Sequence, residues 1–329
     1  MSKGVHRFAL LVAGATFFLI IAGANVTSHD AGLATSDWPR SNGTFFPKMV
    51  GNLFWEHGHR MVATGVGLLT IAFNFYVWQV EVTLARLLKR ILGKSDSIGQ
   101  KRYRQEPRRW VRRFGLMALG VVIAQGLLGG LTVKLNLPLA VSAAHATLAQ
   151  LFFLITVSLA VFTSRDWVTP DSSVRENGAG VSLRTLCVVA LAVILTQLVL
   201  GATLRHSATW DQDLPTGLLL AHVVVAIVVT LFLGATAATV LLRYRSEKYL
   251  GRPALVALTL LFAQLLLGLA AYITRMASPY DPQPLTPMVS VTVAHVACGA
   301  LVFATTIVLT LRVFRVLRVD RQEYVLAPA

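Results

Sequence analysis

The chain has 329 residues, of which 55% are hydrophobic and 14% are charged, and its formal net charge is +15. Its apolar runs reach the roughly 20 residues that a helix needs to cross about 30 Å of hydrocarbon, which excludes an ordinary water-soluble fold. The positive charge is not distributed as in a nucleic-acid-binding protein, because the basic residues collect in alternate loops between these runs.

Eight apolar segments are predicted to cross the membrane. The first follows MSKGVHR directly, with no small-residue cleavage site, so it is expected to be retained. The sequence therefore predicts an all-α membrane protein with eight transmembrane helices. In chain order they cover residues 8–26, 57–80, 114–133, 139–163, 185–204, 215–242, 253–274 and 288–311.

The basic residues predict how these helices are oriented. Of the 30 Lys and Arg residues, 24 lie at the N-terminus, in 86–113, 164–184 and 243–252, and in the C-terminal tail. The positive-inside rule places these segments, and both termini, in the cytoplasm of what we expect to be a bacterial cytoplasmic membrane. The run KRYRQEPRRWVRR could bind anionic lipid or RNA, but beside a span a lipid-facing, topogenic loop is the favoured interpretation.

An internal repeat runs through the odd-numbered spans. A glutamine precedes a glycine by four residues in three of them, and Gly23 ends the first span more loosely in the same way. The pairs are Gln125 with Gly129, Gln197 with Gly201, and Gln264 with Gly268.

Each even-numbered span carries a histidine near its outer end. Pro138 and Pro215 stand seven residues before two of them, so the spacing itself repeats. Four helical hairpins predict two pseudo-symmetric four-helix halves, residues 1–163 and 182–329, joined by a polar linker at 164–181. The four histidines are His59, His145, His222 and His295.

Histidines in membrane spans are costly, so four at matching depth indicate a pathway or a cofactor. Two imidazoles on facing helices are what six-coordinate haem iron requires, and four histidines allow one haem site in each half. Zinc also accepts histidine, but no cysteine or carboxylate cluster joins these residues. Cys187 and Cys298 are expected to be packing residues.

Arginines at the outer ends of the spans suit the carboxylates of a haem. Arg205 and Arg275 are placed to receive propionates through charge-assisted bonds, although snorkelling to the interface is an equal alternative. Glu56 precedes His59 by three residues, so the two share a helix face. Arg60, four after Glu56, can pair with it or with a propionate. Glu56 could orient a water or accept a proton, or it could be a helix-capping acid.

With these residues in view, the chain resembles the haem A synthase family. The similarity is carried by EHGHR at 56–60, AGLATSDWPRSNGTFFP at 31–47, LGGLTVKLNLP with AHATLAQ, AHVVVA at 221–226 and VAHVACGALV at 293–302. It implies oxidation of the C8 methyl group of haem O to the formyl group of haem A by successive hydroxylations. It also implies a b-type haem cofactor on His222 and His295, a substrate haem on His59 and His145, and catalysis by Glu56.

The same resemblance implies certain partners: haem O and the enzyme that supplies it, an electron acceptor, and membrane lipid, but no nucleic acid. A homo-oligomer is left open. Many members carry a cysteine pair in the first outer loop, whereas residues 27–54 here contain none. His57 has no role in the family pattern and is treated as an interfacial residue, turned about 100° from Glu56.

Two other classes of protein remain open at this stage. A dihaem b-type electron-transfer cytochrome would use all four histidines without requiring Glu56, and a haem carrier would need ligands that release their haem. A proton-coupled carrier is disfavoured, because it is expected to place acidic residues at mid-membrane, where these spans have almost none.

Overall fold

The computed structural model describes residues 3–80, 109–168, 174–175, 181–207, 214–244, 246–277 and 284–318. Within these ranges, eight helices are long and apolar enough to cross a membrane, which confirms a multi-pass, helical membrane protein. They are α1 (Lys3–Ser28), α2 (Asn52–Phe75), α5 (Arg109–Lys134), α6 (Leu139–Thr163), α8 (Leu183–His206), α9 (Thr216–Arg243), α10 (Lys248–Met276) and α11 (Thr286–Val316).

Four short elements complete the described chain. A single π-helical turn, η1 (Tyr76–Val80), continues α2, and α7 (Arg165–Val168) follows α6. The strands β1 (Val174–Arg175) and β2 (Leu317–Arg318) pair in parallel, which joins the segment after α7 to the end of α11. Most of the predicted basic loop, 86–108, lies outside the described residues, as does part of the predicted linker.

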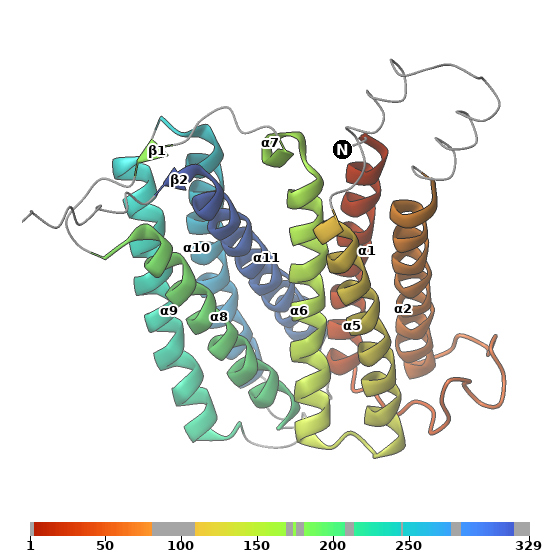
Figure 1. Ribbon diagram of the computed structural model, residues 1–329. Helices are drawn as coiled ribbons and strands as arrows, with labels where there is room; N and C mark the ends of the chain where they lie inside the picture. The colour runs from red at the N-terminus through yellow and green to blue at the C-terminus, as the bar shows by residue number, and fades with distance from the viewer. Residues whose placement is uncertain are drawn as a thin grey trace, which may run out of the picture.

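The eight helices stand side by side in one bundle (Figure 1). In the first half of the chain, α1 packs on α2 and α6, and α5 packs on α2 and α6. In the second half, α8 packs on α9 and α11, and α10 packs on α9 and α11. The two groups of helices are joined by contacts of α11 with α1 and α6, and of α6 with α8. As a result, α6 and α11 are the most buried of the eight helices.

Large apolar side chains lie on the surface of the bundle as well as in its interior. Leu242 is 83% exposed, and Leu231 and Phe262 are about two-thirds exposed at 65% and 66%, whereas Leu233 and Leu309 are fully buried. Such an outer surface is stable against lipid tails, and a helix satisfies its backbone hydrogen bonds internally, as hydrocarbon requires.

Proline residues begin three of the helices that carry the predicted histidine ligands. Pro138 precedes α6, Pro215 precedes α9, and Pro287 lies in the first turn of α11. A proline has no N–H, and the first N–H groups of a helix have no partner within it, so a proline costs little there. Because each histidine follows its proline by about two turns, the helix starts set the ligands at similar depths.

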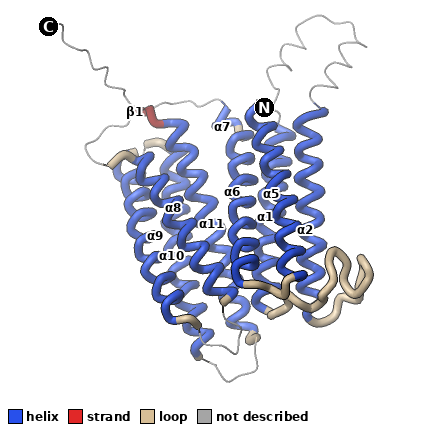
Figure 2. Tube along the Cα trace, turned by 60° about the horizontal axis from the view of Figure 1, so that its bottom comes forward, coloured by secondary structure: helices blue, strands red, loops and turns tan. Residues whose placement is uncertain are grey.

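The two ends of the bundle differ in chemistry. We call the end where α1, α5, α8 and α10 finish the histidine end, and the opposite end, which carries most of the described Lys and Arg residues, the basic end. Figure 2 shows the histidine end with the α1–α2 loop, residues 29–51, wrapped beside α2. Which end faces the cytoplasm stays a prediction from the positive-inside rule.

Candidate functional site

Each of the four histidines lies against a glycine of the preceding long helix. A Cβ atom added to that glycine would crowd the ring carbon Cε1 of the histidine, since ordinary contact begins at 3.4 Å. Each imidazole therefore lies in space that is open only because the facing residue is a glycine. The distances from the added Cβ to Cε1 are 3.1 Å for Gly23 and His59, 2.8 Å for Gly129 and His145, and 3.0 Å for both Gly201 with His222 and Gly268 with His295.

The repeated glutamines contact the same rings. The side-chain amide Nε2 of Gln197 donates to Nε2 of His222 at 3.1 Å, and that of Gln264 donates to Nε2 of His295 at 3.3 Å. A spacing of four residues puts glutamine and glycine on one helix face, so each odd helix presents both to its histidine.

The hairpins of the first half vary this pattern. Gln125 lies 3.4 Å from Nε2 of His145 and also donates to the backbone carbonyl of His145 at 3.0 Å. In the first hairpin, Leu19 stands where the glutamine would be. The sequence repeat identified the glutamines but not their hydrogen bonds, because a spacing alone does not say which neighbouring helix a side chain meets.

The four imidazoles are half-buried and have hydrogen-bonding capacity to spare. Nδ1 is buried without a hydrogen-bond partner in all four of them, which is uncommon for a polar atom inside a protein. The donor set is neutral imidazole, which suits iron. An unpaired ring nitrogen in all four hairpins fits a metal ligand better than it fits a packing residue. The rings are those of His59, His145, His222 and His295.

His222 and His295 have the separation that a shared haem iron requires. Their ring centres lie 6.5 Å apart. An imidazole nitrogen lies about 2 Å from its metal, so two imidazoles on opposite sides of one ion have centres roughly 6 Å apart. These two residues therefore fit axial ligation of a haem. No group of three or more metal-ligating His, Cys, Asp or Glu side chains occurs among the described residues, so a zinc site of the usual kind is not found there.

His59 and His145 also lie close enough to interact electrostatically, although they come from α2 and α6. A fifth histidine, His206, ends α8 and interacts in the same way with His145. His206 falls outside the sequence repeat, so spacing alone does not identify it. The second half of the chain thus contributes a titratable side chain near the histidine pair of the first half.

Arg205, beside His206, also reaches the first half of the chain. Its Nη2 donates to Ser28 Oγ at the end of α1, at 3.3 Å. Arg275 and Asp30 both interact with it electrostatically. Two guanidinium groups near the histidine end suit carboxylates such as haem propionates. The propionate contacts of Arg205 and Arg275 stay predictions.

Glu56 is buried, 4% exposed, and both of its carboxylate oxygens are engaged. Oε2 accepts the backbone N–H of Thr35 at 3.0 Å, and Oε1 pairs with Nη2 of Arg60. Nη1 of Arg60 binds the α1–α2 loop, donating to the carbonyls of Asp37 and Arg40 at 2.9 and 2.7 Å. The predicted pairing of Glu56 with Arg60 is confirmed, and Arg60 is anchored to protein groups.

The interpretation of His57 as an interfacial residue is wrong. His57 is 4% exposed, and its two ring nitrogens contact Ser41 Oγ at 2.9 Å and the carbonyl oxygen of Phe45 at 3.1 Å. Ser41 itself is fully buried. The sequence reasoning failed because the α1–α2 loop folds back over this side of α2, which no local periodicity reveals.

The same loop reaches α5. The indole of Trp38 lies flat on Gly130, where an added Cβ would be 2.7 Å from Cδ2. Lys134 Nζ donates to the carbonyl of Ser36 at 3.4 Å. The adjacent glycines Gly129 and Gly130 thus serve two contacts, one with His145 and one with the loop.

A tight turn organises the middle of this loop around Asp37. Its carboxylate accepts the Thr35 hydroxyl and the backbone N–H groups of Asn42 and Gly43, the last two at 2.9 and 2.8 Å. The Thr35 hydroxyl and the Gly43 N–H hold the pKa of Asp37 well below its usual range. The loop has no cysteine, and hydrogen bonds to buried polar side chains of α2 hold it in place. Cys187 and Cys298 are both buried, as expected of packing residues.

Comparison with known proteins gives a consistent result. Residues 49–211 match the model of a family described as cytochrome oxidase assembly protein, COX15-CtaA. The matched range contains Glu56, His59 and His145 and ends before His222.

Three curated relatives are each described as heme A synthase and are each 29% identical to this chain. The protein of Caulobacter vibrioides matches over 164 residues, 49% of this chain and 41% of the relative. The protein of Symbiobacterium thermophilum matches over 210 residues, 62% of this chain and 60% of the relative. The protein of Caulobacter sp. strain K31 matches over 140 residues, 42% of this chain and 36% of the relative. The chain thus spans between about a third and three-fifths of the length of these relatives.

Proposed function

Because the chain belongs to the COX15-CtaA family of cytochrome oxidase assembly proteins, we propose that it is a haem A synthase. In this reaction the C8 methyl group of haem O is oxidised to a formyl group by successive hydroxylations. The observation that carries the proposal is the recurrence of one arrangement in four hairpins. A half-buried histidine whose Nδ1 atom is buried and unpaired lies against a glycine that leaves it room.

Two haem sites imply two similar halves. Residues 1–163 form the half that receives substrate, residues 182–329 form the half that holds the cofactor, and 164–181 is the polar linker. The packing of α1, α2, α5 and α6 on one another, and of α8 to α11 on one another, supports a pseudo-symmetric pair of four-helix bundles. Both termini lie in the cytoplasm, and the haem sites lie toward the outer face of a bacterial cytoplasmic membrane.

In the cofactor half, His222 and His295 would hold a b-type haem. Their separation of 6.5 Å and the glycines that make room for their rings support this role. The side-chain amides of Gln197 and Gln264 lie against the same rings and would restrict their orientation. The haem would supply one-electron redox chemistry when bound, and Arg205 and Arg275 would bind its propionates.

In the substrate half, His59 and His145 bind haem O and thereby set its methyl group against fixed protein groups. Glu56 shares a helix face with His59. Thr35 and Arg60 hold its carboxylate in one orientation, so Glu56 orients a water or accepts a proton as the methyl carbon is oxidised. Burial under the α1–α2 loop limits the access of bulk water to that carboxylate.

The pigment bound by the full chain tests this function. The chain is expressed in a host that makes haem O, and the haems extracted from the purified protein are separated and identified. Haem A or a hydroxylated haem O is the expected product. Haem B alone would instead indicate a dihaem electron-transfer cytochrome, and unmodified haem O that exchanges freely would indicate a haem carrier.

A further inference from the structure

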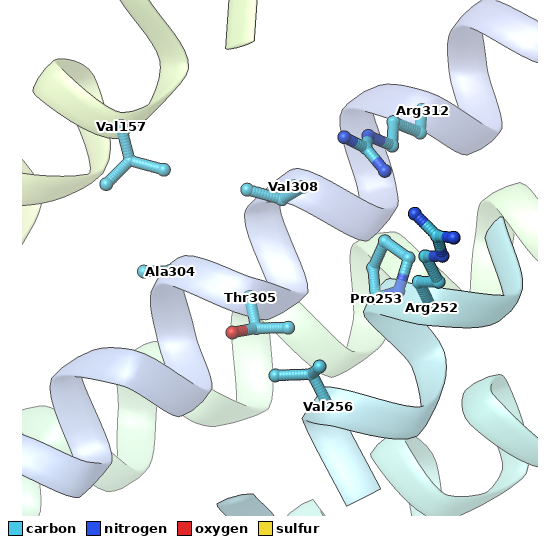
Figure 3. A pocket seen from close by; sticks show the side chains of 8 residues that line it. All are labelled: Val157, Arg252, Pro253, Val256, Ala304, Thr305, Val308 and Arg312. Carbon is cyan, nitrogen blue, oxygen red and sulfur yellow. The ribbon is translucent and has the colours of Figure 1, made fainter. Parts of the chain in front are cut away.

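A groove far from the histidines opens between α6, α10 and α11, near the basic end of the bundle. Its volume is about 270 Å³. Figure 3 shows two guanidinium groups at one end of it and small apolar side chains toward the other. The groove is lined by Val157, Arg252, Pro253, Val256, Ala304, Thr305, Val308 and Arg312.

A proline in α10 accounts for the position of one arginine. Pro253 lies inside the helix and has no N–H, so it cannot donate to the carbonyl of Tyr249, four residues earlier. That carbonyl accepts Nη1 of Arg312 from α11 at 3.0 Å. The proline therefore leaves a backbone acceptor open, and the acceptor holds a guanidinium at the lip of the groove.

The charges around the groove favour an anion. Arg252 is exposed and Arg312 is half-buried, and both guanidinium groups lie at the same end of the groove (Figure 3). Asp166 on α7 acts on Arg312 electrostatically and offsets part of this charge. The balance of these three groups stays positive, and guanidinium binds phosphate through paired, charge-assisted hydrogen bonds.

The rest of the lining suits a hydrocarbon chain. Val256 is 48% exposed, and its neighbour Leu255 is 59% exposed, so the groove continues into the apolar surface that faces lipid. Basic pockets between transmembrane helices on the cytoplasmic side bind the head groups of anionic lipids. We propose that this groove binds one anionic phospholipid, with its phosphate on Arg252 and Arg312 and an acyl chain along Val157, Val256 and Val308.

On α11 the groove runs from Ala304 to Arg312, nine to seventeen residues along the helix from His295, so it is independent of the proposed haem chemistry. Its occupant bridges α10 and α11 and touches α6 of the other half. A bound lipid would thereby stabilise the contact between the two groups of helices without taking part in the reaction.

Native mass spectrometry of the full chain with defined lipids tests the proposal. Phosphatidylglycerol and phosphatidylcholine are supplied together, and the ratio of the two bound species is measured. We expect wild type to retain phosphatidylglycerol preferentially, at one molecule per chain. Each arginine removed is expected to lower that preference about fivefold, the contribution typical of one basic residue near anionic lipid.

The test variant combines Arg252→Gln with Arg312→Gln. Its matched control combines Arg243→Gln with Arg315→Gln, which removes the same charge from exposed positions outside the groove. If the test variant folds poorly, Arg252→Gln alone can be used, because it removes an exposed group. Asp166→Asn is expected to raise the preference for phosphatidylglycerol. Equal binding of the two lipids by wild type would overturn the proposal. So would equal losses in Arg252→Gln and the control variant.

Discussion

Substitution of Gly268 by alanine tests whether the glycine beside His295 exists to make room for a haem ligand. The added Cβ would lie 3.0 Å from Cε1 of His295, whereas ordinary contact begins at 3.4 Å. The ring must therefore move by about 0.4 Å. Metal–ligand distances are held to about 0.2 Å, so a shift of this size exceeds what an axial iron bond tolerates.

The fold itself should not suffer from this change. Alanine is favoured over glycine inside a helix by about 0.5–1 kcal/mol, and the displaced atom belongs to a side chain rather than to backbone. We therefore expect Gly268→Ala to be produced and to unfold at the same temperature as wild type or slightly higher. The loss should appear only in the haem, as reduced haem B content or a change from a low-spin to a high-spin spectrum.

Gly234→Ala in α9 is the matched control, because nothing lies within 4 Å of a Cβ added there. It carries the same gain in helix propensity and should keep the wild-type spectrum. The absorption spectrum and the haem-to-protein ratio of the purified proteins decide the comparison. A low-spin spectrum in Gly268→Ala with the haem content of Gly234→Ala would show that the glycine is not needed for ligation.

Three further predictions concern individual side chains. Replacing His222 or His295 by alanine should remove most haem B or make it high-spin, and low-spin spectra in both variants would contradict their assignment as ligands. Glu56→Gln keeps the shape of the side chain and should retain haem B, while the rate of haem O turnover falls by a factor of about 10² to 10⁴. Formation of haem A at the wild-type rate would mean that Glu56 is only a structural partner of Arg60. His57→Ala removes the contacts with Ser41 and Phe45, so limited proteolysis within residues 29–51 should become faster than in wild type, while haem B is kept. An unchanged cleavage rate would mean that His57 does not hold the loop.

Local patterns were sufficient to predict the helices. A run of about 20 apolar residues can cross hydrocarbon only as a helix, because each backbone group must be satisfied within the segment. The predicted spans fall on the eight long helices, which mostly extend beyond them; α1, for example, covers Lys3–Ser28 rather than 8–26. Several of the missing residues, such as Lys3, Arg7 and Arg112, are charged, and hydropathy does not extend a span across them.

The repeat carried the prediction further than composition could. Equal spacing of Pro138 from His145 and of Pro215 from His222 already indicated a common depth. The recurring pair of glutamine and glycine indicated a common helix face. These are properties of one helix at a time, so periodicity reveals them.

Contacts between segments far apart in the chain were decided only by the tertiary structure. His57 appeared interfacial because its neighbours on α2 do not include Ser41, which the α1–α2 loop brings to it. The sequence around Gly130 does not predict that the indole of Trp38 packs against it. Sequence alone determined which residues form helices and which histidines recur, because hydrocarbon and helix geometry act locally. Which side chain meets which depended on how the loop folds back and how the helices pack, and that is a property of the whole chain.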